Sequence, residues 1–428
     1  IIDSIGSVMQ AILILAVIGM LIGTWIGGGI VPTLIYYGLQ ILSPSFFLIT
    51  ALLLCSIVSI ATGSSWTTAG TVGVALIGIA EGLGISVALA AGCIVSGAYF
   101  GDKMSPLSDT TNLAPAMAGA TLFDHIRHMF YTTGVSYGIV AVIYIVLGLQ
   151  YKGQELNASE INGILEAIKS IYIINPLFLL VPVITIGAVA LKIPAIPGLL
   201  IGVVLGGFCM IFQGGDLGAI LEAINYGVEA ASGHEMVDEL LTNGGMQSMM
   251  WTISLIMCAL TFGGVLESTG MMQCIAGKML GWAKSTGSLI LVTVLSCLFV
   301  NILCADQYLG IALPGKMFKD AYAERGLAPR NLSRALEDSG TVTSALVPWN
   351  TCGATMAGFL GVSTFVYAPF AFFNILSPIV SVIYGFTGFS IMTLEEDPAS
   401  PQYKHKMKLK KSGRELEEYI ANYQAKAN

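Results

Sequence analysis

Residues 101–112 read GDKMSPLSDTTN, a polar block set between apolar stretches of the chain. The block combines two aspartates and a lysine with a proline and several hydroxyl or amide side chains. Ionisable groups and a proline-broken backbone are tolerated at membrane depth only where they line a cavity or bind a solute. If its flanks cross a membrane, the block therefore predicts a substrate or ion site.

The composition of the whole chain favours a membrane protein. Of its 428 residues, 55% are hydrophobic and only 11% are charged, with a mean hydropathy of +0.79. Soluble domains carry about 25% charged residues. No lysine or arginine precedes Lys103, and none lies between Ile193 and Gly277. The eight cysteines show no C-x-x-C spacing, and we expect no zinc site, no cofactor and no nucleic-acid partner.

Apolar segments of about 20 residues predict membrane-spanning helices. Two segments, 45–79 and 286–316, are too long for one crossing and too short for two, and each has a polar break in its middle. This pattern is typical of re-entrant hairpins, which enter and leave on one side with their tips near the midplane. The candidate segments are 7–26, 30–43, 45–79, 85–122, 131–149, 173–191, 195–212, 247–266, 286–316, 330–361 and 364–388.

The pattern in two of these segments, 85–122 and 330–361, indicates a helix broken at a proline within a polar run. The first break is PLSDT at 106–110 and the second is PWNTC at 348–352, and a Met-Ala-Gly step follows each of them. In both halves a hairpin, a charged loop and a broken helix follow in that order. We therefore predict an all-α polytopic membrane protein with two inverted-topology repeats, whose hairpins and broken helices meet near the bilayer midplane.

Charge in the loops predicts the orientation, because cytoplasmic loops collect Lys and Arg. We expect a multi-pass protein of the cell membrane, of the bacterial inner-membrane type. Arg127, the 316–334 stretch and the C-terminal tail would be cytoplasmic, and the acidic 213–245 loop external. The predicted parts are a first transport repeat at 1–150, connector helices and the external loop at 151–245, a second transport repeat at 246–392, and a basic tail at 393–428.

The two breaks supply the oxygen atoms that a small cation prefers, and unwound helix ends add backbone carbonyls. Asp109, Ser108 and Asn350 are the predicted cation ligands. A raised pKa from burial would let a carboxylate carry a proton, and the proton-carrier candidates are Asp109, Asp102, Asp306 and Glu337. The full set of predicted ion- or substrate-binding residues is Asp102, Ser105, Ser108, Asp109, Thr110, Thr111, Asn112, Asp306, Asn350 and Thr351.

Some of these residues have a simpler structural interpretation. Ser, Thr and Asn at a break also cap helices. Asp102 and Lys103 either neutralise each other as a pair or take part in transport. Glu337 and Asp338 face either the cavity or Arg334. The histidines fall in predicted loops or the tail, and a metal site built from them is not expected.

Three stretches carry a resemblance to a known family. GDKMSPLSDTTNLAPAMAG at 101–119, GGMQSMMWTISL at 244–255 with ESTG after it, and SALVPWNTCG at 344–353 resemble the NhaC-type sodium/proton antiporter family of the ion transporter superfamily. The resemblance covers essentially the whole chain. It implies two inverted repeats, frequent homodimers, and a functional role for Ser105 to Asn112 and Trp349 to Thr351. Asp306, Glu337 and Asp338 are predicted from position alone.

The resemblance implies exchange of cytoplasmic Na+ for external H+, because one buried carboxylate holds either ion but rarely both. No nucleotide-binding G-x-x-x-x-G-K-[ST] motif occurs, which favours coupling to ion gradients. The alternative is a malate/lactate exchanger coupled to Na+ or H+, with helix N-termini and Lys103 binding the carboxylates. A channel fits less well because the sequence shows no repeated filter sequence, and a membrane scaffold would not require polar breaks in both halves.

Overall fold

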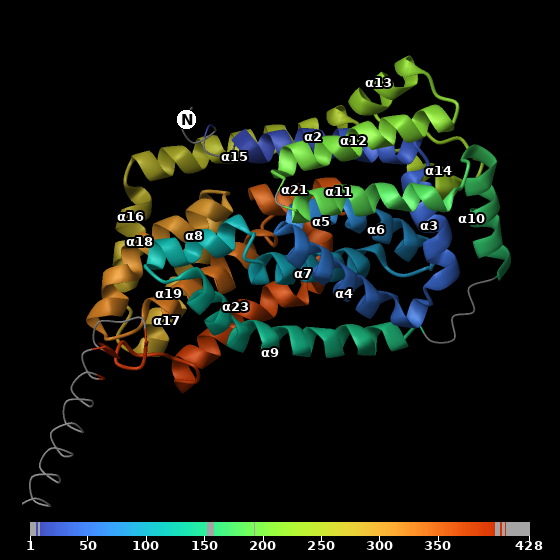
Figure 1. Cartoon of the computed structure of the whole chain (residues 1–428). Helices are drawn as coiled ribbons and strands as arrows, with labels where there is room; N and C mark the ends of the chain where they lie inside the picture. Colours follow the sequence, from blue (N-terminus) through green and yellow to red (C-terminus); the bar gives the residue numbers. More distant parts are fainter. Residues whose placement is uncertain are drawn as a thin grey trace, which may run out of the picture.

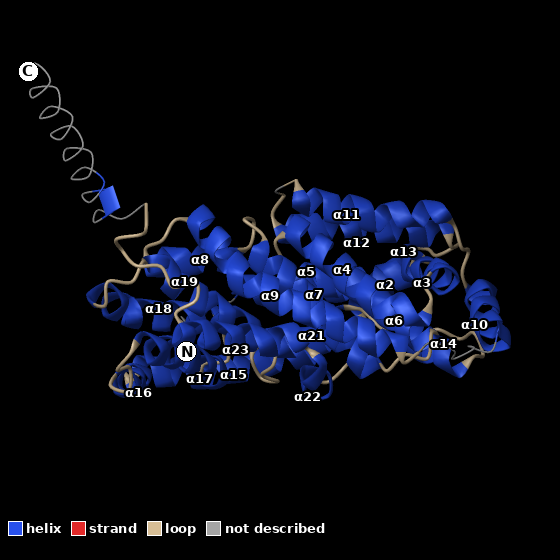
Figure 2. Cartoon of the chain, turned by 90° about the horizontal axis from the view of Figure 1, so that it is seen from below, coloured by secondary structure: helices blue, strands red, loops and turns tan. Residues whose placement is uncertain are grey.

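The computed structural model describes residues 9–151, 158–191 and 193–398, together with Gly6 and residues 403, 404 and 407. Within these residues the chain is helical, and its β-structure is limited to two isolated bridges, Val228 with Asn243 and Leu327 with Thr393. Figures 1 and 2 show helices joined by loops and turns throughout the described chain. The predicted all-α fold is confirmed.

The helices follow one another with short connections. The first part contains α2 (Met9–Gly27), α3 (Ile30–Ile41), α4 (Pro44–Thr62), α5 (Ser65–Thr68), the π-helix η1 (Ala69–Gly73), α6 (Val74–Gly82), α7 (Val87–Met104), α8 (Asp109–Ala118) and α9 (Leu122–Leu149). The middle contains α10 (Ala158–Ile171), η2 (Pro176–Leu179), α11 (Leu180–Ala190), α12 (Ala195–Phe212), α13 (Leu217–Asn225), α14 (Glu235–Leu241) and η3 (Met246–Met249). The last part contains α15 (Met250–Ser268), α16 (Met271–Leu280), α17 (Thr286–Leu303), α18 (Gln307–Glu324), α19 (Pro329–Leu336), the π-helix η4 (Glu337–Thr341), α20 (Val342–Ser344), α21 (Thr351–Leu360), α22 (Thr364–Tyr367), η5 (Ala368–Phe370) and α23 (Phe372–Thr387).

Long apolar helices make the chain a multi-pass membrane protein. In the described part of the chain, five helices are long and apolar enough to cross a bilayer, or eight spans if each of three bent helix pairs is one. Large apolar side chains also face outward, as Ile139, Val142 and Val146 do on α9. Such an outer surface suits lipid, because the bilayer core offers no water to solvate polar groups.

The predicted breaks fall where the sequence placed them. The 45–79 segment breaks between α4 and α5, and the 286–316 segment breaks between α17 and α18. Both turns use a left-handed residue, Gly63 with φ +69° and Ala305 with φ +57°. The first arms, α4 and α17, each satisfy the length and composition of a full crossing. The re-entrant depth of the two hairpins therefore stays a prediction.

The broken helices pack across the molecule. α8, which follows the first break, lies against α18 and α19 from the second part of the chain. α21, which follows the second break, lies against η1 of the first hairpin. Each post-break helix thus contacts the opposite half of the chain.

Acidic and basic segments gather at opposite ends of the helices. Arg330, at the start of α19, joins the beginning of α9 to the C-terminal segment through Asp124 at 3.4 Å and Asp397 at 2.5 Å. The α13 and α14 segment of the acidic 213–245 loop lies at the other end of the molecule (Figure 1). The four predicted parts stay a prediction, and most of the 393–428 tail lies outside the described residues.

Candidate functional site

The first break is built by the sequence around Pro106. α7 ends at Met104 because Pro106 has no N–H to donate and restricts Ser105 to the extended conformation. Ser108 then caps α8 by accepting a hydrogen bond from the Thr111 backbone N–H. The Thr111 hydroxyl donates to the carbonyls of Asp102 and Lys103 at 3.1 and 3.0 Å, which satisfies the open end of α7.

Asp102 and Ser105 fasten this break to the tip of the first hairpin. One carboxylate oxygen of Asp102 accepts hydrogen bonds from the Ser65 hydroxyl at 2.7 Å and the Ser65 backbone N–H at 3.2 Å. The Ser105 hydroxyl donates to the Ile60 carbonyl at 2.7 Å. Asp102 is buried, and these contacts hold its charge beside the start of α5.

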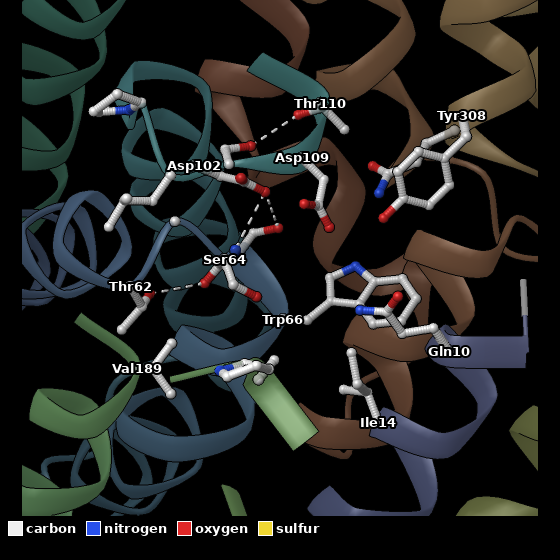
Figure 3. Close-up of a pocket in the computed structure, with 18 of the residues that line it drawn as sticks. Gln10, Ile14, Thr62, Ser64, Trp66, Asp102, Asp109, Thr110, Val189 and Tyr308 are labelled. Carbon is white, nitrogen blue, oxygen red and sulfur yellow. Dashed lines mark hydrogen bonds between the residues drawn. The ribbon is translucent and has the colours of Figure 1, made fainter. Parts of the chain in front are cut away.

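A cavity of about 790 Å³ lies between the break and the hairpin tip, and Asp109 lines it. Figure 3 shows the Asp109 side chain directed into the same space as Trp66 and Tyr308. Asp109 is exposed, so the expectation of a buried carboxylate is wrong for this residue, and no described residue forms a hydrogen bond or ion pair with its carboxylate. The cavity is lined by Gln10, Ile14, Thr62, Gly63, Ser64, Ser65, Trp66, Asp102, Pro106, Leu107, Ser108, Asp109, Thr110, Val189, Ile193, Pro194, Ala195, Gln307 and Tyr308.

The remaining residues predicted at the first break have backbone partners or lie near the cavity. The Ser108 and Thr110 hydroxyls are 3.1 Å apart, and both residues line the cavity. Asn112 donates to the carbonyls of Pro106 at 3.0 Å and Ser108 at 2.7 Å. Thr111 and Asn112 therefore stabilise the break with their donors, whereas Asp109 presents its oxygens to the cavity.

The second break forms a separate cluster with the second hairpin tip. Asn350 caps α21 by accepting from the Cys352 N–H at 3.0 Å, and its amide donates to the Asn301 carbonyl at 3.0 Å. The Thr351 N–H donates to the Ala305 carbonyl at 2.8 Å. Asp306 caps α18 by accepting from the Leu309 N–H at 2.9 Å. Asn350, Thr351 and Asp306 are absent from the cavity lining, whereas Gln307 and Tyr308 beside them are part of it.

A buried ionic pair joins the two halves and corrects one expectation from the sequence. Lys103 pairs with Asp338 on η4, and not with Asp102, and both side chains are fully buried. The Asp338 carboxylate also accepts from Thr132 at 3.1 Å and Ser377 at 3.2 Å. The Lys103 ammonium thus lies against the Asp338 carboxylate of η4 and the Ser377 hydroxyl of α23, and Thr132 of α9 bonds the same carboxylate.

Glu337 is connected to the cavity through one hydroxyl. The Thr110 side chain donates to the Glu337 carboxylate at 3.0 Å, and Glu337 is fully buried. The other Glu337 oxygen has no hydrogen-bond partner among the described residues. Glu337 and Asp338 open the π-helix η4, a form of backbone that is frequent at functional sites. Nothing in the sequence around Thr110 or Glu337 indicates this contact, which joins residues 227 positions apart.

The interpretation of the histidines as loop residues is wrong for two of them. His125 and His128 lie in the first turns of α9, which begins at Leu122 after the Thr121 cap. His125 bonds Ser333 at 2.8 Å and His128 bonds Asn331 at 3.2 Å, so both rings are buried against α19. The apolar run of this span starts only at residue 131, whereas the helix begins at Leu122. The polar first turns therefore could not be recognised from hydropathy.

The chain has two helices broken at polar runs, and the break in the first lies beside a cavity with two aspartates. Apolar helices long enough to cross a bilayer surround it. This combination is typical of a polytopic membrane transporter. A family model described as the Na+/H+ antiporter family matches residues 97–389 of the chain. The chain belongs to this family. It is an antiporter and not an enzyme, and the family named from the sequence resemblance is confirmed.

Individual relatives in this family differ in the solutes they are named for. The Na+/H+ antiporter NhaC of Alkalihalophilus pseudofirmus is 42% identical over 393 residues, which cover 91% of this chain and 84% of that protein. The malate-2H+/Na+-lactate antiporter of Bacillus subtilis is 40% identical over 389 residues, covering 91% and 83%. The arginine/ornithine antiporter ArcD of Halobacterium salinarum is 42% identical over 403 residues, covering 94% and 83%.

Proposed function

We propose that the chain exchanges cytoplasmic Na+ for external H+ at the cavity that contains Asp109. One observation carries the proposal: the Asp109 carboxylate lies in a cavity of about 790 Å³ without a protein partner among the described residues. A carboxylate in this position is available to a cation or to a proton. The family and the NhaC relative support Na+ as the cation.

Competition at Asp109 produces the exchange. Na+ prefers several oxygen ligands, and Ser108, Thr110 and Asp102 line the cavity beside Asp109. A proton on Asp109 removes the charge that attracts the ion, so the two are bound in turn. Asp102 is restrained by Ser65, and we assign it the supporting role of a fixed negative charge beside the ion.

Glu337 is the second proton-carrier candidate that the geometry favours. Its contact with Thr110 links the cavity lining to η4, on the far side of the break. Asp306 and Asn350 serve as helix caps in this structure. Within the proposal, a role for them as ion ligands requires the two hairpin tips to approach each other during alternating access.

The malate/lactate alternative is less well supported by the cavity. Among the described residues that line it, two are aspartates and none is Lys, Arg or His. A dicarboxylate would meet like charge there, and like charges repel at short range. Lys103, the counter-charge that this alternative requires, is occupied by Asp338 and does not line the cavity.

Transport by purified protein in sealed liposomes tests the proposal. A pH-sensitive dye is trapped inside, sodium chloride is added outside, and the assay is repeated with sodium malate outside a lactate-loaded lumen. Proton movement with sodium chloride alone is the expected result. Proton movement that requires both malate and lactate would assign the chain to organic-acid exchange instead.

The proposal also covers the repeat structure, the oligomeric state and the orientation in the membrane. We infer two inverted repeats from the reciprocal packing of α8 and α21, a homodimer from the family resemblance, and a cytoplasmic tail in a bacterial inner membrane from the loop charges. Labelling of single introduced cysteines in intact cells tests the orientation, and native mass spectrometry tests the dimer.

A further inference from the structure

The chain folds back on itself after α23. Residues 388–397 form a C-terminal strap that runs beside the turn joining α18 to α19. The Ala328 N–H donates to the Met392 carbonyl at 2.9 Å, and the Leu394 N–H donates to the Gly326 carbonyl at 2.8 Å. Backbone hydrogen bonds therefore attach the strap to the segment that leads into α19.

Side chains of α19 hold the strap from the other side. The Asn331 amide oxygen accepts from the Met392 N–H at 3.0 Å, and the Asn331 amide nitrogen donates to the Met392 carbonyl at 2.6 Å. Arg330 pairs with Asp397 at 2.5 Å. Asn331 is fully buried and Asp397 is only 3% exposed, so water competes little for these contacts.

Ser390 is the strained residue of the strap. Its φ of +55° lies in the left-handed region, which costs an L-residue about 1–2 kcal/mol. Arg334, fully buried in the last turn of α19, donates to the Ser390 carbonyl at 2.9 Å and to its hydroxyl at 3.2 Å. Strained residues persist only where their surroundings hold them, and they gather at active sites and switch regions.

Arg334 has a second acceptor close by. Its Nε and one terminal nitrogen have no hydrogen-bond partner among the described residues. Asp338 lies four residues further along, on the same face of the helix, and its charge acts on the Arg334 guanidinium. One Asp338 oxygen is held by Lys103, and the other has no partner in the described part of the chain. Arginine bonds a carboxylate more strongly than it bonds a serine.

We propose that the C-terminal strap is an autoinhibitory contact. With the strap in place, Arg334 is held on Ser390. On release of the strap, Arg334 turns to Asp338 and competes with Lys103 for that carboxylate. The Lys103 to Asp338 pair joins α7 to η4, so this change of partner loosens the contact between the two broken helices. The inference goes beyond the proposed function, because it concerns contacts outside the cavity and holds for whichever solute the cavity carries.

A reversible cross-link between strap and turn tests the proposal. Leu327 and Thr393 form an isolated antiparallel bridge between the two backbone hydrogen bonds. The Cα atoms of such a pair lie about 4.5 Å apart, within the range of roughly 4.4–6.8 Å found in disulfides. The Leu327→Cys/Thr393→Cys protein is oxidised with copper phenanthroline, reconstituted in liposomes and assayed before and after reduction with dithiothreitol. We expect the oxidised protein to exchange several-fold more slowly than the reduced protein. Equal rates would overturn the proposal.

The other isolated bridge of the described chain supplies the matched control. Val228 and Asn243 pair in the acidic loop, at the opposite end of the molecule. Val228→Cys/Asn243→Cys should exchange equally fast when oxidised and when reduced. The parent protein, in which Cys258 and Cys274 are exposed, controls for oxidation of native thiols. Slowing of the same size in either control would assign the effect to oxidation in general and overturn the proposal.

Weakening the strap should have the opposite effect. Asp397→Asn removes the charge that pairs with Arg330, and we expect exchange several-fold faster than in the parent. Asp320→Asn, on the exposed side of α18, should leave the rate unchanged. A merely structural contact would not speed exchange when it is weakened, so a folded Asp397→Asn protein with an unchanged or lower rate would overturn the proposal. If Asp397→Asn does not fold, the cross-link decides.

A double-mutant cycle tests whether Arg334 transmits the effect. Arg334→Gln keeps an amide donor for the Ser390 carbonyl and removes the charge that would pair with Asp338. In that background Asp397→Asn should no longer speed exchange. An equal gain in both backgrounds would overturn the assignment of Arg334 as the switch.

The same assays separate this inference from the proposed function. If the parent moves protons with sodium chloride but the cross-linked protein keeps its full rate, the strap is refuted and Na+/H+ exchange is retained. If the parent moves protons only with malate outside and lactate inside, Na+/H+ exchange is refuted. The variants are then compared in that assay, where the same differences in rate are expected.

Discussion

Lys103 on α7 and Asp338 on η4 form an ion pair that joins the first broken helix to the second, and neither side chain is exposed. Ser377 accepts a hydrogen bond from Lys103 at 2.9 Å. Two opposite charges are thus neutralised inside the molecule, next along the chain to Asp102 of the cavity lining. Because the pair crosses between the two halves, it fixes how α7 and η4 sit against each other.

Removal of one member should destabilise the protein strongly. Lys103→Met leaves Asp338 as an unpaired buried charge, which costs about 3–5 kcal/mol. Lys103→Met combined with Asp338→Leu removes both charges and should recover most of that loss. The measurement is the thermal unfolding midpoint in detergent for the parent, the single variant and the double variant. A single variant as stable as the parent would contradict the ion pair.

Asp109→Asn should abolish Na+-driven proton movement and leave the fold intact. The carboxylate has no protein partner among the described residues, so its neutralisation breaks no internal contact. Asp320→Asn, on the exposed side of α18 and outside the cavity, is the matched control and should transport normally. Both proteins are compared by unfolding midpoint and by initial rate in liposomes. Normal exchange by Asp109→Asn would remove this residue as the ion carrier.

The apparent affinity for Na+ should depend on pH if both ions use one carboxylate. Protonation removes the ion's partner, so the half-saturating Na+ concentration rises as the pH falls, by up to about tenfold per pH unit. The maximal rate at saturating Na+ should change much less. Initial rates over a range of Na+ concentrations at several pH values measure both quantities. A half-saturating concentration that is independent of pH would contradict competition.

The breaks at Pro106 and Pro348 could be predicted from the sequence because proline and polar residues interrupt apolar runs by a local mechanism. The helix breaks around Gly63 and Ala305 follow from the same kind of signal. Caps at Ser108, Asp306 and Asn350 are also local, since each cap bonds a backbone N–H two or three residues ahead.

Contacts between distant parts of the chain could not be predicted in the same way. Lys103 has Asp102 as its neighbour in sequence, yet its partner Asp338 lies 235 residues away. Neither the sequence around Lys103 nor the sequence around Asp338 indicates that the two residues pair. Gln307 lines the cavity, and its side-chain oxygen has no hydrogen-bond partner among the described residues. It was missed for a related reason, because an unpaired acceptor can be recognised only when its surroundings are known. His125 and His128 show a third limit, since a helix can continue past the apolar run that reveals it.

The two hairpin turns should respond oppositely to a change of one methyl group. Gly63 has φ +69°, and an added Cβ would lie 2.7 Å from the Leu107 backbone carbon, so Gly63→Ala should destabilise the protein. Ala305 has φ +57°, a conformation that costs an L-residue about 1–2 kcal/mol. Ala305→Gly relieves that strain at the cost of a more flexible unfolded chain, and should be neutral or slightly stabilising. Unfolding midpoints in detergent distinguish the two. Equal destabilisation by both would contradict the left-handed turn at Ala305.

Thr110 should couple the cavity to Glu337 through its hydroxyl. Thr110→Val keeps the side-chain shape and removes the hydrogen bond of 3.0 Å to the buried carboxylate, whereas Thr110→Ser keeps the hydroxyl. A hydrogen bond to a charged group contributes about 1.5–3 kcal/mol. We therefore expect Thr110→Val to slow exchange by about tenfold or more and to change its pH profile, because the Glu337 carboxylate loses its hydrogen bond to the cavity lining. Thr110→Ser should behave like the parent. Thr355→Val, at a buried threonine on α21 whose hydroxyl bonds only its own helix, controls for the loss of a hydroxyl elsewhere. If Thr110→Val and Thr110→Ser gave the same rate and the same pH profile, Glu337 would have no part in the transport cycle through this contact, and Asp109 would remain as the proton carrier with Asp102 as its nearest charged neighbour in the cavity.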